Sequence, residues 1–338
     1  MIGNTTPAQS ASPGWGPRLR DLVASPLAGL TREKLRRRWV DYAFALAFIV
    51  LIILVASVSD VFFTQRNISN LIRQIVTNGL ISLGMLVVIL TGGIDLSVGP
   101  VLALTGIMVS GFQQWMPLPL AILISLLVGL GCGFFNGFVI ARFKLQPFIV
   151  TLATLGAIRG LVYVYSETPI TPPDPTFREI LGSAYVGPIP LAGLIMVLFF
   201  VLTWIFLNRT PAGRAIVAIG GNAEAVRLAG INVNRHIILA YMISGFFAAL
   251  AGVILASRVG IAQPSVGSGF ELDAIAACVI GGAILGGGGG GVGGTVGGVL
   301  TLGLINNLLN MFNVQSYYQQ IFKGLIILFA VLARRKEQ

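Results

Sequence analysis

Long apolar stretches follow one another along most of the chain, and short segments between them hold most of the polar and charged residues. A helix needs about 20 apolar residues to cross the hydrocarbon core of a membrane, and fewer where it is broken or buried in protein. By this criterion the sequence predicts ten membrane spans. They are Val40–Val58, Leu71–Leu90, Leu96–Gly111, Leu118–Ala141, Phe148–Tyr165, Ile189–Leu207, Ile237–Ser257, Leu272–Leu285, Gly293–Phe312 and Ile321–Ala333.

This pattern predicts an all-α polytopic membrane protein with about ten transmembrane helices. The third and eighth spans are short and border glycine runs, so we expect them to form short or broken helices. Composition agrees, because 55% of the residues are hydrophobic and only 10% are charged, whereas a soluble domain carries roughly a quarter charged residues. We therefore divide the chain into a flexible basic tail, residues 1–39, and one transmembrane domain, residues 40–335.

A short pattern recurs in the two halves of the chain, after about 170 residues. The repeat predicts two five-helix halves, and a unit repeated after an odd number of spans is inverted, as in many transporters. Chance similarity between apolar segments is the alternative. The recurring residues are Gly133, Asn136, Phe143, Gln146 and Phe148 in the first half, and Gly303, Asn306, Phe312, Gln315 and Tyr317 in the second.

The net charge of +10 is distributed unevenly between the predicted loops. If the N-terminus is cytoplasmic, sixteen of the 22 basic residues fall in cytoplasmic segments. This bias is typical of inner-membrane proteins and predicts that both termini are cytoplasmic. The basic charge therefore reports topology and does not indicate nucleic-acid binding. The basic cluster at residues 32–38 is expected to meet anionic lipid headgroups.

Two polar segments supply candidate residues for a translocation pathway. Asp95 and Ser97 lie in a glycine-containing segment between two spans. They either cap the following helix or line the pathway, since carboxylates within a membrane are functional candidates. Before the eighth span, Asp273 is placed to cap a helix, Glu271 to face the outer mouth, and Gln263 to offer neutral hydrogen bonds that suit a polyol. An ordinary polar loop is the alternative there.

Arg159 and Lys323 are basic residues inside predicted spans. A bare charge in hydrocarbon is costly, so we expect each to form an ion pair or to extend to the membrane surface.

The predicted cytoplasmic loop 208–236 has the features of a docking surface for another protein, although an ordinary interfacial linker is the alternative. Asn222 is placed to cap a short helix over residues 223–229, and a glycine ends it. Glu224 and Arg227 are three residues apart and so share a face of that helix. The candidate docking residues are Gly213, Arg214, Gly221, Asn222, Glu224, Arg227 and Gly230.

No pattern in the chain indicates catalysis or a cofactor. The run from Gly286 to Gly291 lacks the following lysine that a phosphate-binding loop requires. Cys132 and Cys278 lie in apolar stretches, and His236 is the single histidine, so no metal site is expected. We therefore expect a chain that is not an enzyme and binds no cofactor itself.

Four ordered blocks carry a resemblance to the ribose-type sugar permeases of ATP-binding cassette importers, a family that moves ribose, xylose, galactose and autoinducer-type sugars. The blocks are GGIDLSVG (92–99), GRAIVAIGGNAEAVRLAGINVN (213–234), AQPSVGSGFELDAIAACVIGG (262–282) and SYYQQIFKGLIILFAVL (316–332). The glycine run before the ninth span departs from the family, which usually has a basic residue there.

The resemblance implies a permease that translocates a monosaccharide, pentose or hexose, or a related polyol, delivered by a periplasmic binding protein. It implies a second permease chain, with a homodimer expected, and a cytoplasmic ATPase that holds the ATP and Mg²⁺. The segment Gly213–Gly230 would be the coupling region that contacts this ATPase. The alternative function is an ion- or proton-coupled secondary transporter of a small polar solute, in which Asp95 would titrate or bind the ion.

Overall fold

The structure is a computed structural model that describes residues 62–315, 317–321 and 324–325, and the statements below concern these residues. The tail 1–39, the predicted span Val40–Val58, most of Ile321–Ala333 and Lys323 lie outside the described residues.

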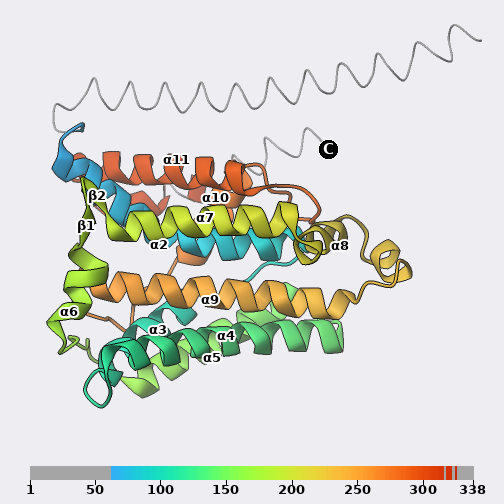
Figure 1. Ribbon diagram of the computed structural model, residues 1–338, viewed down its shortest axis with the longest axis horizontal. Coiled ribbons are helices and arrows are strands. Elements are labelled where there is room, and N and C mark those ends of the chain that lie inside the picture. The colour runs from blue at the N-terminus through green and yellow to red at the C-terminus, as the bar shows by residue number, and fades with distance from the viewer. Residues whose placement is uncertain (1–61, 316, 322–323, 326–338) are drawn as a thin grey trace, which may run out of the picture. The chain divides into compact units, whose positions relative to one another are not determined.

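Six described helices are long and apolar enough to cross a membrane, so the chain is a multi-pass membrane protein. Figure 1 shows the long helices side by side, with α8 at one end of the bundle and α6, β1 and β2 at the other. The six spanning helices are α2 (Gln65–Leu90), α4 (Leu118–Phe143), α5 (Pro147–Tyr165), α7 (Leu191–Arg209), α9 (Val233–Val259) and α11 (Val292–Met311).

The remaining elements are short or lie at the ends of the bundle. The helix α3 (Val98–Phe112) has 15 residues and α10 (Phe270–Ile280) has 11, so the two spans expected to be short are short. The others are α6 (Pro175–Phe177), the π-helix η1 (Arg178–Ser183), the antiparallel pair β1 (Tyr185–Val186) and β2 (Ile189–Pro190), and α8 (Pro211–Leu228).

Several predicted boundaries were wrong, three of them for reasons that the structure shows. The helix α2 begins six residues before the predicted start, because the Thr64 hydroxyl accepts the N–H of Asn67 and caps it. The first two residues of the predicted sixth span form β2 instead. The eighth span ends at Ile280, five residues early, because the chain turns at Gly282 with φ +104°, a left-handed conformation that favours glycine.

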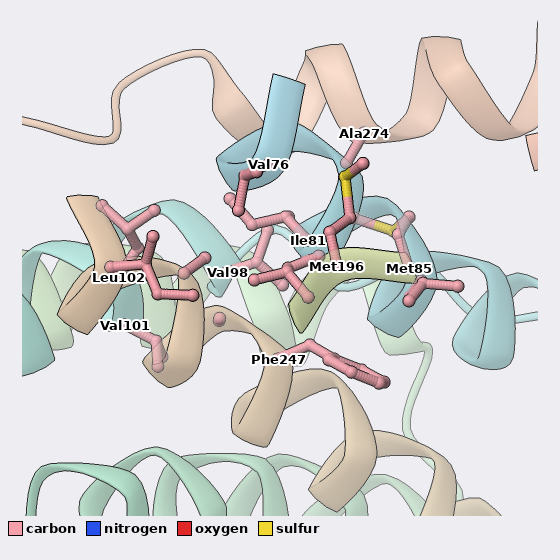
Figure 2. Packing of buried hydrophobic residues seen from close by; sticks show 14 of the residues in the cluster. Val76, Ile81, Met85, Val98, Val101, Leu102, Met196, Phe247 and Ala274 are labelled. Atoms are coloured by element: carbon pink, nitrogen blue, oxygen red, sulfur yellow. The ribbon is translucent and has the colours of Figure 1, made fainter. Parts of the chain in front are cut away.

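The core is centred on α2 and α9, which are the most buried of the spanning helices. Figure 2 shows Ile81 and Met85 of α2, Val98 of α3, Met196 of α7 and Phe247 of α9 gathered in one buried cluster. By contrast, α4 exposes bulky apolar side chains such as those of Phe134 and Phe138 on its outer face. An apolar outer face is what a helix in contact with lipid or another membrane chain requires.

The helices α4 and α9 pack with their backbones in close contact. A Cβ atom built on Gly133 would lie closer than 3.0 Å to the carbonyl oxygen of Tyr241, and one on Gly137 would lie 2.7 Å from Cα of Ile238. Small residues let membrane helices approach in this way, where packing replaces the hydrophobic effect as the source of helix association. The high glycine content of the chain therefore has a structural use here.

The order and contacts of α2, α3 and α4 recur in α9, α10 and α11. The helix α3 packs on α9 as α10 packs on α2, and α3 contacts α4 as α10 contacts α11. The residues Ser97-Val98-Gly99 recur 168 positions later as Ser265-Val266-Gly267. The backbones of Gly99 and Gly267 are in direct contact, because a Cβ on either would lie closer than 3.0 Å to the carbonyl oxygen of the other.

Candidate functional site

Asp95 lies in the turn between α2 and α3 and is almost fully buried, with 1% of its surface exposed. One carboxylate oxygen accepts the Ser97 backbone N–H at 3.0 Å and the Ser97 hydroxyl at 2.6 Å. The other oxygen accepts the Ser244 hydroxyl of α9 at 2.8 Å. Asn136 of α4 donates to the Ser97 hydroxyl at 2.9 Å. The carboxylate therefore joins the start of α3 to α9 directly and to α4 through Ser97.

The predicted cap is not formed: the Asp95 carboxylate accepts the N–H of Ser97, which precedes α3, and the Ser97 side chain makes no capping hydrogen bond to the helix. Both oxygens are satisfied by uncharged donors, and Asp95 has no ion-pair partner among the described residues. A place for Asp95 and Ser97 on a translocation pathway stays a prediction. Ser244 was not predicted as a partner of Asp95, while Asn136 stood out only as part of the repeated pattern.

Glu271 contacts the start of α10. Its carboxylate accepts the backbone N–H of Gly269, the residue that precedes this helix, at 3.1 Å. Its other oxygen lies 2.5 Å from the place that a Cβ on Gly99 would occupy, so Glu271 also packs against the first turn of α3. Asp273 is buried and faces Asn78 of α2, with 3.5 Å between the amide nitrogen and a carboxylate oxygen. Whether Glu271 and Asp273 meet a substrate stays a prediction.

Arg159 of α5 has backbone carbonyls as partners. One guanidinium nitrogen donates to the carbonyl oxygens of Pro264 and Val266 at 2.7 and 2.8 Å. The expected ion pair is not found among the described residues, where the loop before α10 supplies two carbonyl acceptors instead, and extension to the membrane surface stays a prediction. Arg159 fixes this loop to α5.

Gln263 lies in the same loop, at the wall of a small cavity of about 130 Å³ between α3 and α9. The other lining residues are mostly apolar, among them Leu102, Ile107 and Val259. A neutral amide beside apolar groups suits a neutral polar ligand, but a role for Gln263 in substrate contact stays a prediction.

The helix α8 is divided by a kink at Asn222, whose φ of −160° and ψ of 96° are not helical. Before the kink, residues such as Ile216 and Ile219 are buried, and the Thr210 hydroxyl accepts the N–H of Gly213 at the start of the helix. After the kink, the Asn222 side chain accepts the N–H of Ala225 at 2.9 Å, which confirms the predicted cap.

The second part of α8 projects from the bundle as a short exposed helix, residues 223–228. Leu228 at its end is 77% exposed, and Gly230 reverses the chain with φ +80°, as the sequence predicted. We call residues 223–228 the exposed helix.

Glu224 and Arg227 form an ion pair on the exposed helix. The Arg227 Nε donates to a Glu224 carboxylate oxygen at 2.9 Å. This hydrogen bond holds the pKa of Glu224 below its usual value, with a further contribution from the charges of Arg227 and Lys144. It likewise raises the pKa of Arg227. Both groups are therefore charged at neutral pH and accessible to a partner.

A cleft of about 560 Å³ separates the exposed helix from the ends of α2 and α4 and the start of α9. Its charged lining residues are Glu224, Arg227 and Lys144, so the cleft carries a net positive charge. Gly213, Arg214 and Gly221 lie outside this lining, along the part of α8 before the kink and at the kink itself. The expected docking residues thus lie in α8, except for Gly230 just beyond its end, and only Glu224 and Arg227 line the cleft.

Comparison with known proteins gives a consistent result. Residues 67–331 match the family model described as "Branched-chain amino acid transport system / permease component". Ribose import permease protein RbsC of Bacillus subtilis is 45% identical over 295 residues, 86% of this chain and 92% of the relative. RbsC of Haemophilus influenzae is 47% identical over 85% of this chain and 91% of the relative. L-arabinose transport system permease protein AraH of Escherichia coli is 38% identical over 89% and 92%. The comparison with solved structures found no match.

Proposed function

The chain belongs to the ribose-type sugar permeases of ATP-binding cassette importers and is a monosaccharide import permease, and from this premise we propose how it assembles and works. We propose that it translocates a pentose that a periplasmic binding protein delivers, with energy from a cytoplasmic ATPase. The observation that carries the proposal is the identity of 45–47% to ribose import permeases along more than four fifths of the chain. Relatives named for arabinose and xylose follow at 38% and 35%, and all three sugars are pentoses.

In this proposal the ATPase binds the exposed helix of α8. This helix is capped by Asn222, carries an ion pair and ends in an exposed apolar side chain. Its neighbours support it on one side only, so its other side offers a surface to a partner. ATP and Mg²⁺ belong to the ATPase, and the chain itself contributes no catalytic group. Movement of the exposed helix would switch the permease between outward and inward access.

We further propose that the domain consists of two inverted five-helix halves, the first and last helices of which include residues 40–58 and 321–333. The recurring contacts of α2–α4 and α9–α11 support this arrangement, as does the reciprocal contact of Gly99 and Gly267. An approximate two-fold axis through this contact would relate the two segments. The access pathway of inverted-repeat transporters lies near such an interface.

We propose that the complex contains two identical permease chains in the inner membrane, with both termini in the cytoplasm. The end of the bundle that carries α8 supports this orientation, because it combines several basic residues with a single carboxylate. The basic residues are Arg142, Lys144, Arg209, Arg214, Arg227 and Arg235, and the carboxylate is that of Glu224. The helices with exposed apolar faces, such as α4, and the basic tail 1–39 are the parts expected to contact lipid.

Purification of the tagged chain from its native host in mild detergent tests this function. A stoichiometric ATPase, two permease chains in each complex, and ATP hydrolysis stimulated by a sugar-binding protein are expected. Reconstituted complex should import labelled ribose in competition with arabinose or xylose. A chain that purifies alone and transports in liposomes without ATP would establish the secondary transporter instead.

A further inference from the structure

Three backbone segments that are distant in sequence meet where α8 joins the bundle. They are the end of α2, the last turn of α8 before its kink, and the glycine-rich loop between α10 and α11. The backbone N–H of Gly288 in this loop donates to the carbonyl oxygen of Leu90 in α2 at 3.1 Å. A Cβ on Gly220 of α8 would lie closer than 3.0 Å to that same oxygen and to the Gly288 nitrogen. We call Leu90, Gly220, Gly287 and Gly288 the glycine junction.

The glycine-rich loop tolerates a side chain at the glycine junction no better than α8 does. Gly287 and Gly288 have φ of +93° and +72°, a region that side chains with a Cβ rarely adopt. A Cβ on Gly287 would lie 2.7 Å from Cα of Gly220 and 2.8 Å from the nitrogen of Gly92. The three segments thus touch through their backbones, without an intervening side chain.

Direct backbone contact makes this junction stiff. A flexible side chain between two segments can change rotamer and absorb a displacement, whereas closely packed backbone atoms cannot be compressed. The glycine junction lies two residues before the kink at Asn222, beyond which the exposed helix begins. A displacement of the exposed helix therefore reaches the junction through only a few residues.

We propose, on the basis of the proposed function, that Gly220, Gly287 and Gly288 are positioning residues that transmit movement of the exposed helix to the membrane helices. Through Leu90 the movement reaches α2, and through the glycine-rich loop it reaches α10 and α11. The junction thereby connects α8 at once to elements of both proposed halves. It also gives a role to the glycine run at 286–291, which has no phosphate-binding pattern.

A matched pair of glycine substitutions tests the proposal in the assembled complex. Gly220→Ala places a methyl group against Leu90 and Gly288, whereas Gly293→Ala, in the first turn of α11, points its methyl group into open space. Both variants should bind the ATPase as wild type does, because neither residue is in the exposed helix. Ribose uptake per ATP hydrolysed should fall at least tenfold for Gly220→Ala and stay within twofold of wild type for Gly293→Ala.

Hydrogen–deuterium exchange on the wild-type complex, with and without a non-hydrolysable ATP analogue, provides a test that needs no variant. We expect exchange to change together in peptides covering residues 223–230 and 286–291. A change confined to residues 223–230, or equal uptake per ATP in the two alanine variants, would overturn the role of the junction alone. A wild-type chain without ATP-dependent uptake would overturn the proposed function as well.

Discussion

At the scale of single residues, Asp95 raises the question of whether its charge or its shape is needed. Its carboxylate accepts three hydrogen bonds from Ser97 and Ser244 and is almost fully buried. Asparagine has the same shape and keeps one acceptor oxygen, and a serine hydroxyl can accept as well as donate. We expect Asp95→Asn to destabilise the protein by about 1–3 kcal/mol, because the hydrogen bonds to a charged acceptor are weakened.

Uptake per folded complex should stay within twofold of wild type in the Asp95→Asn variant. Thermal unfolding in detergent and ATP-driven uptake, normalised to the amount of folded complex, measure the two effects separately. Complete loss of uptake by a folded complex would show that the negative charge is essential and would favour an ion-coupled role for Asp95.

Gly99 is a second residue at which the addition of one methyl group should disrupt the packing. A Cβ there would lie closer than 3.0 Å to the Gly267 carbonyl oxygen and 2.5 Å from a Glu271 carboxylate oxygen. Because overpacking forces backbone shifts, we expect Gly99→Ala to lower the free energy of unfolding by about 1–3 kcal/mol. Gly156→Ala in α5 is the control, since nothing lies within 4 Å of its Cβ position. Equal melting temperatures for the two variants would contradict the close contact of the two repeated segments.

At the scale of elements, substitutions in the exposed helix can distinguish the stability of this helix from its role in docking. Glu224→Lys removes the ion pair with Arg227 and places two positive charges three residues apart, which destabilises a helix by a few tenths of a kcal/mol. We expect this variant to co-purify with less ATPase, while the fold within the membrane is unchanged. Co-purification in pull-down with the tagged permease is the measurement.

The double variant Glu224→Lys/Arg227→Glu provides the control, because it restores an ion pair with its charges reversed. If the partner recognises the charges themselves, ATPase binding should stay weak in the double variant. Full recovery of binding would mean that the pair acts only within the helix, and unchanged co-purification of Glu224→Lys would count against α8 as the docking element.

The elements also show what the sequence could predict. The cap at Asn222 and the chain reversal at Gly230 were predictable, because both depend on residues within one turn of the helix. The early end of α10 was missed because the predicted span extends to the longer glycine run from Gly286, although the pair Gly281-Gly282 already carries a helix-stop signal. The partner of Arg159 was missed for a related reason, since its acceptors are backbone carbonyls more than 100 residues away.

The candidate site was predictable to a similar extent. Asp95 and Ser97 stood out as polar residues between apolar spans, and the structure brings them together. Ser244 and Asn136 complete this set of contacts but lie inside apolar helices, where a single small polar residue is common. The glycine junction joins positions up to about 200 residues apart, and only tertiary structure brings such positions into contact.

At the scale of the whole molecule, the charges at the two ends of the bundle predict its orientation. The end with α8 has six basic residues and one carboxylate, whereas the segment 166–187 at the other end has Glu167, Asp174 and Glu179 against Arg178. Basic residues in short loops remain in the cytoplasm during insertion, so α8 should face the cytoplasm and the segment 166–187 the periplasm.

Cysteine labelling tests this orientation in a background where Cys132 and Cys278 are replaced by alanine. Glu167→Cys and Glu224→Cys place one thiol at each end, and both positions are exposed. A maleimide that cannot cross the inner membrane should label Glu167→Cys, but not Glu224→Cys, in cells whose outer membrane alone has been permeabilised. Disruption of the inner membrane should make both react. The reverse pattern would place α8 outside the cell, where no ATPase could reach it, and would refute the importer mechanism and the role of the glycine junction together.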